Sequence, residues 1–359
     1  MPRLVALDQP PGPAFVAALL AVWDAGDAAF PVDARLPPDQ REAVARSVGV
    51  GDEVAPGDAL VVATSGTTGR PRGVVLTHDA VAASARATSA RLAVDPAADR
   101  WLACLPLAHV GGLSVVTRAL VTGTPLTVVP RPDAVLVAAA AAAGATLVSL
   151  VATALRRGVD PRPFRVVVLG GSAPPPPGER PANAVTTWGM TETGSGVVYD
   201  GVPLDGVEVR VVDGEVHVRG PMLLRAYRDG TDPKDADGWF ATGDLGEVGA
   251  DGRLTVFGRR GDLIVTGGEN VWPEPVERAL EAHPAVAEAG VCGRPDPEWG
   301  HRVVAVVVPA DPAAPPTLED LRAVVRDHLP PWCAPRELVL ADRLPRTALG
   351  KLRRAALPA

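Results

Sequence analysis

Four short segments of the chain combine glycine, hydroxyl and charged residues in patterns that could bind a nucleotide. The first, Thr64–Gly73, reads Thr-Ser-Gly-Thr-Thr-Gly-Arg-Pro-Arg-Gly. Glycines let the backbone turn sharply and bring N–H groups to an anion, and hydroxyls with Arg70 and Arg72 add further donors for phosphate. The spacing differs from a Walker A loop, GxxxxGK[ST]. The segment therefore predicts a phosphate loop of another kind, with a flexible surface turn as the structural alternative.

The second segment, Thr187–Thr193, reads Thr-Trp-Gly-Met-Thr-Glu-Thr and places an aromatic ring beside hydroxyls and a carboxylate. The ring of Trp188 could stack on a base, and a hydroxyl could contact phosphate. Glu192 could help to hold Mg²⁺, because magnesium takes one or two carboxylates together with phosphate oxygens and water. The structural alternative is a core tryptophan beside a polar turn.

The third segment pairs Ala241–Leu245 with Gly258–Asp262, which follows a predicted hairpin. A carboxylate such as Asp244 is the usual partner of ribose hydroxyls. Arg259 could reach the same sugar or a phosphate. The alternative is an ordinary turn with a salt bridge, which contributes little when it is exposed.

The fourth segment, Leu344–Lys351, lies near the C-terminus and ends on an unusual residue for this chain. Of 35 basic residues, only Lys234 and Lys351 are lysines. The ammonium of lysine is compact and lies on a flexible stem, so it can enter a crowded site and contact two oxygens. A lysine could therefore mark a position that arginine cannot fill. The alternatives are chance survival and a solvated tail residue.

Composition limits the classes of protein to consider. The chain has 359 residues, 47% of them hydrophobic, with a net charge of −7. This length accommodates one large domain and a smaller one. The acidic balance disfavours nucleic-acid binding, which usually needs a basic face. Anionic ligands must therefore be held by local features rather than by the overall field.

Membrane and secretory alternatives are disfavoured as well. The uncharged run Ala134–Leu155 reaches the length of a membrane span, but it is mostly alanine, and Gly144 divides it into a helix over 134–143 and a strand over 145–151. The start of the chain lacks a secretory signal pattern. The cysteines form neither a CxxC pair nor a zinc-type cluster, so they predict reduced thiols in the core of a cytoplasmic protein. They are Cys104, Cys292 and Cys333.

The elements that must position these segments follow from hydrophobic patterning. Strand-like runs alternate with helix-like ones, which favours a mainly parallel sheet covered by helices. The strands are expected at Ala59–Thr64, Val74–Leu76, Trp101–Leu105, Leu126–Val129, Ala145–Val151 and Arg165–Leu169. Thr77 or Asp79 is expected to cap the helix that follows the second of these strands.

After Gly201 the pattern changes to hairpins, which predicts a small β-subdomain. Glu208–Val212 and Glu215–Arg219 flank Asp213-Gly214, a strong signal for a tight turn. A second hairpin is expected between Leu245–Val248 and Leu254–Phe257. We place the domain boundary after residue 257, giving an N-terminal domain over 1–257 and a C-terminal domain over 258–359.

The C-terminal domain is predicted to be α+β. A proline near its start favours a helix over Pro273–Ala282. Val303–Val308 is an apolar strand, and Asp311–Pro316 is a surface linker. Thr317 and Asp320 resemble a capping box that opens a helix ending at Leu329.

The four segments occur together and in an order that resembles the adenylate-forming superfamily of acyl-CoA synthetases, peptide-synthetase adenylation domains and luciferases. The resemblance runs from Asp58 to the C-terminus. It implies an α/β fold with a large N-terminal domain of mainly parallel sheets, a small β-subdomain and a small mobile α+β C-terminal domain. It also implies ATP and Mg²⁺ as cofactors, with coenzyme A as co-substrate.

Residue roles carry over as implications of this resemblance. The β- and γ-phosphates of ATP would be gripped by Thr64, Ser65, Gly66, Thr67, Thr68, Gly69 and Arg72. Adenine would be bound by Gly170, Gly171, Ser172, Trp188 and Gly189. Thr191 would contact the α-phosphate, and Glu192 would contact Mg²⁺. Asp244 and Arg259 would contact the ribose. Lys351 would bridge the substrate carboxylate and the α-phosphate, and Gly267 and Gly268, in the Gly267–Asn270 loop, would line the pantetheine tunnel.

The sequence departs from the family pattern at several positions. The usual lysine of the phosphate loop is Arg72, and the usual tyrosine before Gly189 is Trp188. The hinge between the domains is often Asp or Lys in the family and is Gly261 here. The chain is also shorter than most relatives ahead of the phosphate loop, so the N-terminal domain must be trimmed.

The acid substrate is predicted from a further resemblance. The short N-terminal part and the stretch Ala29–Pro37 look most like actinobacterial o-succinylbenzoate–CoA ligases of menaquinone synthesis. The acyl pocket would be bordered by His109, in Leu105–Leu113, and lined by Leu150–Thr153, which ends on Thr153, and by Gly170–Pro174. The structural alternative for His109 is a satisfied core histidine. The second carboxylate of such a substrate requires a cation in the pocket, and Arg118 and Arg35 are the candidates.

Other functions remain open at this point. One alternative is another aryl- or fatty-acyl-CoA ligase, which would need a deeper apolar tunnel for a fatty chain. Another is a non-catalytic nucleotide-binding homologue, against which Lys351, Glu192 and Asp244 argue. A carrier-loading adenylation domain is a third. The partners are expected to be a small carboxylic acid and coenzyme A, with no nucleic acid and no membrane span, and a homodimer is left open.

Overall fold

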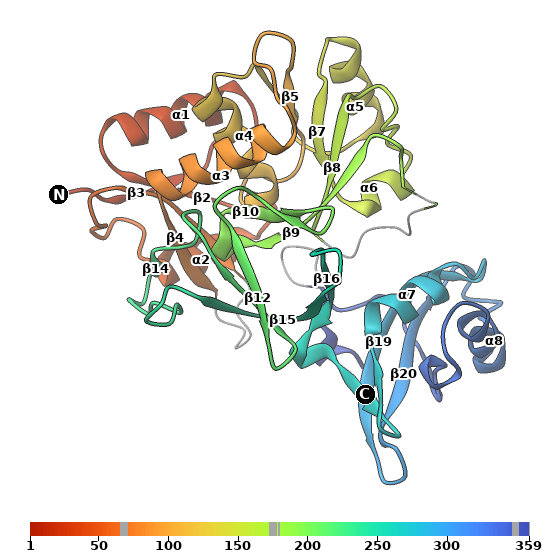
Figure 1. Ribbon diagram of the computed structural model, residues 1–359. Coiled ribbons are helices and arrows are strands. Elements are labelled where there is room, and N and C mark those ends of the chain that lie inside the picture. Colours follow the sequence, from red (N-terminus) through yellow and green to blue (C-terminus); the bar gives the residue numbers. More distant parts are fainter. Residues whose placement is uncertain (65–70, 172–177, 179, 347–351, 359) are drawn as a thin grey trace. The chain divides into compact units, whose positions relative to one another are not determined.

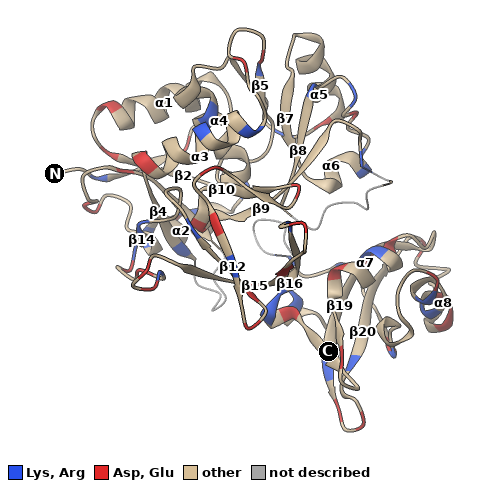
Figure 2. Cartoon of the chain, viewed as in Figure 1, with Lys and Arg blue, Asp and Glu red and all other residues tan. Residues whose placement is uncertain are grey.

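A computed structural model describes residues 1–64, 71–171, 178, 180–346 and 352–358 (Figure 1). The chain divides into two compact units. The large unit comprises residues 1–210, 217–241 and 248–255, and the small unit comprises 211–216, 242–247 and 256–359. The boundary after residue 257 stays a prediction. Acidic and basic residues are interspersed over the described elements of both units (Figure 2).

The first sheet of the large unit is built around buried strands from the N-terminal part of the chain. Its order is β1-β2-β3-β4-β14, with β1, β2 and β3 parallel and the two remaining pairs antiparallel. The strands are β1 (Leu4–Leu7), β2 (Ala28–Pro31), β3 (Asp58–Thr64), β4 (Arg72–Thr77) and β14 (Ala226–Tyr227). Helices α1 (Pro13–Asp24) and α2 (Pro38–Ser47) each begin with proline, whose fixed φ suits a first turn. Residues 1–56 therefore supply two strands and two helices of this unit.

The second sheet confirms the predicted parallel arrangement. Its order is β11-β10-β9-β8-β7-β5-β6, and the strands from β9 to β6 run parallel. The strands are β5 (Trp101–Ala103), β6 (Leu126–Val128), β7 (Leu147–Leu150), β8 (Val166–Leu169), β9 (Ala184–Met190), β10 (Ser195–Tyr199) and β11 (Val202–Pro203). The helices are α3 (His78–Arg91), α4 (Val110–Thr122), α5 (Ala134–Ala142) and α6 (Ala152–Arg156). Thr77 caps α3, since its side chain accepts a hydrogen bond from the Ala80 N–H.

The uncharged run Ala134–Leu155 folds as the alternation of helix and strand predicted. Gly144 separates α5 from β7 with a φ of +94°, a left-handed conformation that suits glycine. Among the described residues, no helix has both the length and the apolarity needed to cross a bilayer. Cys104 and Cys333 are buried as predicted, and Cys292 is partly buried and packs against a hydrophobic core cluster of the small unit. Burial raises the pKa of the Cys104 thiol to about 12, so it is not a thiolate nucleophile.

A four-stranded sheet of order β12-β13-β15-β16 forms the predicted hairpins. Its strands are β12 (Glu208–Val212), β13 (Glu215–Arg219), β15 (Phe240–Val248) and β16 (Leu254–Arg259). Asp213 and Gly214 both have positive φ, as a tight hairpin turn requires. The structure corrects one boundary: β15 begins at Phe240, so Ala241–Leu245 lies within a strand and is not a turn.

The small unit contains an antiparallel sheet of order β18-β17-β20-β19, with β21 added parallel to β20. The strands are β17 (Ile264–Thr266), β18 (Glu269–Val271), β19 (Val286–Asp296), β20 (Gly300–Pro309) and β21 (Glu337–Leu340). Helices α7 (Pro273–Glu281) and α8 (Leu318–His328) contribute buried residues to the same core as this sheet. The capping box is confirmed, because Thr317 and Asp320 exchange side-chain to backbone hydrogen bonds.

Candidate active site

The turn that follows β9 carries the predicted phosphate and metal residues. A short 3₁₀ helix, Thr191–Thr193, connects β9 to β10. The buried hydroxyl of Thr193 accepts a hydrogen bond from Met190 N (2.9 Å) and lies 2.6 Å from the carbonyl oxygen of Ser195. These contacts fix the turn and leave Thr191 and Glu192 half-buried.

Gly189 is required by the close approach of β9 and β10. A Cβ at this position would lie 2.2 Å from the Ser195 carbonyl oxygen, a distance that real side chains do not tolerate. Trp188 precedes this glycine, is half-buried and pairs in register with Val198. A glycine here therefore lets the two backbones meet beside the predicted adenine-stacking ring.

The other predicted adenine residues lie at the end of the neighbouring parallel strand. Gly170 and Gly171 directly follow β8, and Leu169 pairs in register with Thr186 of β9. A Cβ on Gly170 would lie 2.9 Å from a methyl carbon of Thr187. The structure therefore brings Gly170 next to the residue before Trp188. Ser172 lies outside the described residues.

Glu192 has the surroundings of a carboxylate that is available to a cation. Its Oε1 accepts a hydrogen bond of 3.0 Å from the Tyr227 hydroxyl. Burial and the charge of Glu192 raise the pKa of Tyr227, which therefore stays a neutral donor. Among the described residues, no arginine or lysine forms an ion pair with Glu192, and no group of three or more metal-ligating side chains occurs. One carboxylate supplemented by phosphate oxygens and water fits Mg²⁺.

Arg72 lies at the base of the predicted phosphate loop. It pairs in register with Thr64, which is the last pair of the antiparallel ladder of β3 and β4 before the predicted loop. Its guanidinium lies 3.6 Å from the centre of the Tyr227 ring, and its Nη2 lies 3.1 Å from Asp229 Oδ2. The loop residues themselves lie outside the part of the chain that the structure describes: Ser65, Gly66, Thr67, Thr68, Gly69 and Arg70.

Within the small unit, the two predicted ribose contacts lie together. Arg259 Nε lies 2.7 Å from Asp244 Oδ1, and Arg259 Nη1 donates to the Thr242 carbonyl at 2.8 Å. The Asp244 side chain is only 10% exposed, whereas that of Arg259 is 43% exposed. The alternative of a fully exposed salt bridge does not apply, because the carboxylate is buried and fixed in place.

The predicted pantetheine loop is the tight turn between β17 and β18. Gly267 and Gly268 have φ of +58° and +83°. A Cβ on Gly267 would lie 2.7 Å from the Trp299 ring, and the Gly267 N–H donates to the Trp299 carbonyl at 2.8 Å. Glycine is therefore required here both by the backbone conformation and by contact with the tryptophan.

The base of the C-terminal tail is held by ion pairs within the small unit. Lys351 and residues 347–350 lie outside the described residues. On either side, Arg346 and Leu352 form an antiparallel bridge. Arg354 lies 2.9 Å from Asp262 and 2.8 Å from Glu277. Asp262 directly follows Gly261, the predicted hinge, in a short 3₁₀ turn.

His109 belongs to a charged cluster with Arg35, which was predicted for the same pocket, and with Asp33, which was not predicted. Arg35 pairs with Asp33 through two hydrogen bonds of 2.8 and 2.7 Å, and Arg35 Nη2 lies 2.6 Å from His109 Nε2. Burial, with a further contribution from the positive charge of Arg35, lowers the pKa of His109 to about 4. Burial alone would raise the pKa of Asp33, but hydrogen bonds from Arg35 outweigh it and lower that pKa. Arg35 therefore donates to a neutral imidazole.

Arg118, one of the two candidates for a pocket cation, is buried in the large unit. It is 2% exposed, donates to Ser195 Oγ (2.6 Å) and Ser114 Oγ (3.2 Å), and lies 5.5 Å from the centre of the Trp101 ring. Its Nε and Nη1 have no hydrogen-bond partner among the described residues. Thr153, by contrast, is exposed at the start of α6. The structure thus pairs His109 with Asp33 and Arg35, rather than with Arg118 or Thr153.

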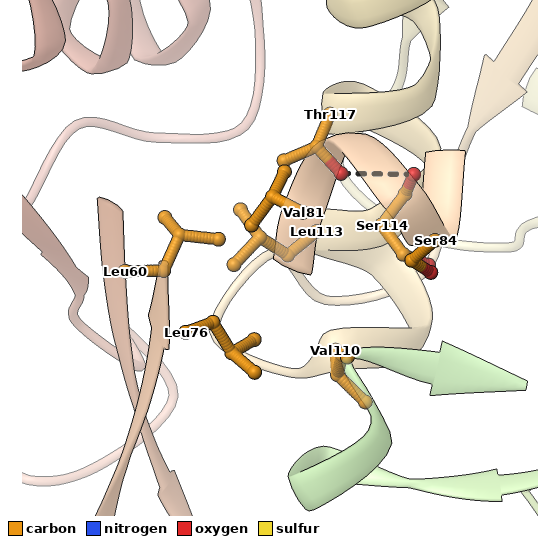
Figure 3. Close-up of a pocket in the computed structure, with 9 residues that line it drawn as sticks. Leu60, Leu76, Val81, Ser84, Val110, Leu113, Ser114 and Thr117 are labelled. Carbon is orange, nitrogen blue, oxygen red and sulfur yellow. Dashed lines mark hydrogen bonds between the residues drawn. The ribbon is translucent and has the colours of Figure 1, made fainter. Parts of the chain in front are cut away.

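A cavity lined in part by Ser114 is too small for the acid. It lies between apolar residues that include Leu60 and Leu76 and polar residues that include Ser84 and Ser114 (Figure 3). Its volume is about 10 Å³, close to the minimum that can hold one water. It therefore suits a buried water rather than the substrate.

Lys234, the other lysine of the chain, shows why arginine would not serve at its position. Its Nζ donates to the carbonyls of Leu224 (2.8 Å) and Arg225 (3.0 Å) and to Asp232 Oδ1 (2.7 Å). Three donors on one nitrogen meet three acceptors, which a planar guanidinium cannot reproduce.

Comparisons with known proteins agree with this fold. The family described as AMP-binding enzyme matches residues 50–228, and the AMP-binding enzyme C-terminal domain matches residues 275–351. Among solved structures, o-succinylbenzoate CoA synthetase from Bacillus subtilis, in complex with the acyl-adenylate intermediate OSB-AMP, aligns with a TM-score of 0.87 at 28% identity. The alignment covers 99% of this chain and 87% of that chain. The same synthetase has been solved with ATP and magnesium ion, and it aligns with a TM-score of 0.86 at 28% identity, covering 99% of this chain and 88% of that chain.

The chain belongs to the AMP-binding enzyme family, which confirms the predicted superfamily and fold. It is similar to the probable 2-succinylbenzoate–CoA ligase of Mycobacterium tuberculosis, at 42% identity over 89% of each chain. It is also similar to the 2-succinylbenzoate–CoA ligase of Bacillus cytotoxicus, at 36% identity over 87% of this chain and 72% of that one.

The low pKa of His109 predicts a pH-dependent stability. An unfolded histidine has a pKa near 6.5. Between pH 6.5 and 4, His109 is therefore protonated in the unfolded state but neutral in the folded state. The free energy of unfolding should therefore fall as the pH falls through this window, by at most about 1.4 kcal/mol per pH unit for this residue.

His109→Gln should flatten this slope, because the neutral side chain does not titrate. Urea unfolding of both proteins from pH 7.5 to 4.5 measures the difference. An NMR titration should show the His109 ring resonances unchanged from pH 7.5 down to 5.5. A ring that protonates near pH 6.5 would contradict the buried, Arg35-bonded imidazole.

Proposed function

We propose that the chain is an AMP-forming acid–CoA ligase that converts o-succinylbenzoate, also called 2-succinylbenzoate, to its coenzyme A thioester in menaquinone biosynthesis. The observation that carries this proposal is the 42% identity over 89% of each chain with a protein that bears that name. The match extends through both units, from the AMP-binding region to the C-terminal domain. The cytoplasmic location stays a prediction, and so does a homodimer.

Each unit carries residues that are predicted to bind the nucleotide. In the large unit, Trp188 and the Gly170–Gly171 turn would bind adenine, and Thr191 would contact the α-phosphate. The phosphate loop, with Arg72 at its base, would bind the terminal phosphates. In the small unit, Asp244 would accept hydrogen bonds from the ribose hydroxyls and Arg259 would hold that carboxylate in place.

The first half-reaction brings a carboxylate to the α-phosphorus of ATP, and pyrophosphate leaves. Repulsion between the anions opposes this approach, so the site must place positive charge and donors where they meet. Mg²⁺, held through Glu192, would supply charge neutralisation at the phosphates. Lys351 would contact both the acid and the α-phosphate, and Thr191 would donate to the phosphate.

The second half-reaction joins the acyl group to the thiol of coenzyme A. The thiol sulfur attacks the acyl carbon, and AMP leaves. We propose that the C-terminal domain turns about Gly261 between the two steps, removing Lys351 and presenting the Gly267–Gly268 turn to pantetheine. Rigid rotation about a short hinge is an established route for such exchanges.

The second carboxylate of o-succinylbenzoate requires a cation, and Arg35 is better placed than Arg118. The Arg35 side chain is 46% exposed, and its guanidinium is oriented by Asp33 beside His109. Arg118 is sealed in the core. We therefore propose that Arg35 and His109 border the acid, while Arg118 ties α4 to β10 through Ser195.

Substrate choice is tested with a panel of acids. Purified protein supplied with ATP, Mg²⁺ and coenzyme A should release pyrophosphate with o-succinylbenzoate at a kcat/KM at least about tenfold above that with benzoate, because only the diacid has a second carboxylate to pair with the Arg35 guanidinium. Medium-chain fatty acids serve as the apolar comparison. Higher activity with benzoate or a fatty acid would contradict the assignment of substrate, though not of ligase class.

Lys351 is tested by separating the two half-reactions. Lys351→Ala should slow formation of the acyl-adenylate by about 100-fold or more, because the charge that neutralises the approaching anions is lost. Thioester formation from preformed acyl-adenylate should stay within about twofold of the parent protein. Lys351→Arg is the matched variant, and it should share the defect if the site needs a compact ammonium. Equal loss of both half-reactions would contradict this role.

A further inference from the structure

One short segment connects the Glu192 turn to the strand that follows the phosphate loop. The Leu224 N–H donates to the Glu192 carbonyl at 2.8 Å, and the Arg228 N–H donates to the Gly73 carbonyl at 2.8 Å. Between them, Tyr227 pairs in register with Val74 of β4. The segment 224–228 therefore spans the space between the predicted metal residue and the base of the predicted phosphate loop.

The same segment is itself held firmly. Lys234 donates to the carbonyls of Leu224 and Arg225, and Arg225 forms two hydrogen bonds of 2.8 and 2.9 Å with the buried carboxylate of Asp58. Asp58 begins β3, so the segment is fixed to the central strands of the first sheet. A rigid support of this kind is what a side chain needs in order to orient another group.

The side chain of Tyr227 contacts both functional residues. Its hydroxyl donates to Glu192 Oε1 at 3.0 Å, and the guanidinium of Arg72 stacks over its ring at 3.6 Å. The tyrosine is 9% exposed. Asp229, two residues further on, holds Arg72 in this position through a contact of 3.1 Å.

A neutral donor suits a carboxylate that must bind a cation. The hydroxyl fixes one oxygen of Glu192 and leaves the negative charge of the group available, whereas an arginine at the same place would neutralise that charge. Hydrogen bonds of this type orient metal ligands, and their removal typically weakens metal binding by 10- to 100-fold.

We propose that Tyr227 is a positioning residue that orients the Glu192 carboxylate for Mg²⁺ and, through its ring, places Arg72 at the base of the phosphate loop. This inference rests on the proposed function, in which Glu192 contacts the metal of the ATP complex. It adds a residue from β14 to the metal site and couples that site to the phosphate loop through one aromatic ring.

The test measures metal binding directly rather than turnover. Mn²⁺ replaces Mg²⁺, the non-hydrolysable analogue α,β-methylene-ATP replaces ATP, and the free Mn²⁺ signal is followed by electron paramagnetic resonance. Tyr227→Phe removes only the hydroxyl and should weaken Mn²⁺ retention in the ternary complex by about tenfold. Binding of the analogue without metal should stay within about twofold, because the ring that supports Arg72 is kept.

Tyr199→Phe is the matched control, since Tyr199 and Tyr227 are the only two tyrosines in the chain. Tyr199 is fully buried, and its hydroxyl lies 3.4 Å from Thr88 Oγ1, outside the Glu192 turn. Its loss should leave Mn²⁺ retention unchanged. Equal weakening in both tyrosine variants would mean a general loss of packing and would overturn the positioning role. Each variant is measured at a temperature well below its own thermal unfolding midpoint, so that a small loss of stability does not change the fraction of folded protein.

Glu192→Gln separates failure of this inference from failure of the proposed function. If Glu192→Gln retains Mn²⁺ as the parent protein does, the metal role of Glu192 is wrong, and both proposals fall on that point. If Glu192→Gln loses Mn²⁺ while Tyr227→Phe retains it, only the positioning role is overturned. In the double variant, Tyr227→Phe should add no further loss to that of Glu192→Gln, because the hydroxyl acts through the carboxylate.

Discussion

Repulsion between anions is the constraint on which the rest of the structure depends. An acid and a triphosphate must meet on a protein whose own net charge is −7. The overall field opposes them, so local donors must overcome it. The arginines at the described parts of the proposed site are each paired with a carboxylate: Arg35 with Asp33, Arg72 with Asp229 and Arg259 with Asp244. Such pairs fix geometry and add little net charge, so in the proposed mechanism Mg²⁺ and Lys351 supply the positive charge at the reacting phosphate, while Arg35 directs its guanidinium toward the second carboxylate of the acid.

In the proposed mechanism, the acidic side chains of the site differ in function because their surroundings differ. Asp244 and Asp33 are buried and face guanidiniums, so their charge is already compensated and they serve as fixed acceptors. Glu192 faces a phenol hydroxyl, and in the proposed mechanism its charge is available to a cation. The two lysines differ in the same way, in whether their charge is already compensated. Lys234 is saturated by backbone and carboxylate oxygens, and the proposed role of Lys351 requires a lysine that is free to meet the substrate.

Local signals in the sequence predicted much of the fold. The Asp213-Gly214 turn, the Thr317 capping box and the break at Gly144 each depend on a few consecutive residues, and each is confirmed. Contacts between distant residues were not predictable in this way. Tyr227 and Glu192 are 35 residues apart, and Arg35 and His109 are 74 apart. No periodic pattern in the sequence predicts a contact between residues this far apart. The burial of Arg118 was not predictable for a related reason, because a charged side chain gives no sign in the sequence that serine hydroxyls and a tryptophan ring will surround it.

The central claim is that activation passes through an acyl-adenylate, and direct detection of that species tests it best. Protein incubated with o-succinylbenzoate, ATP and Mg²⁺ but without coenzyme A should accumulate enzyme-bound o-succinylbenzoyl-adenylate, visible by mass spectrometry after quenching, together with one equivalent of pyrophosphate. Adding coenzyme A should convert it to the thioester and release AMP. Formation of ADP and phosphate instead, or of thioester with no adenylate under any condition, would contradict the account.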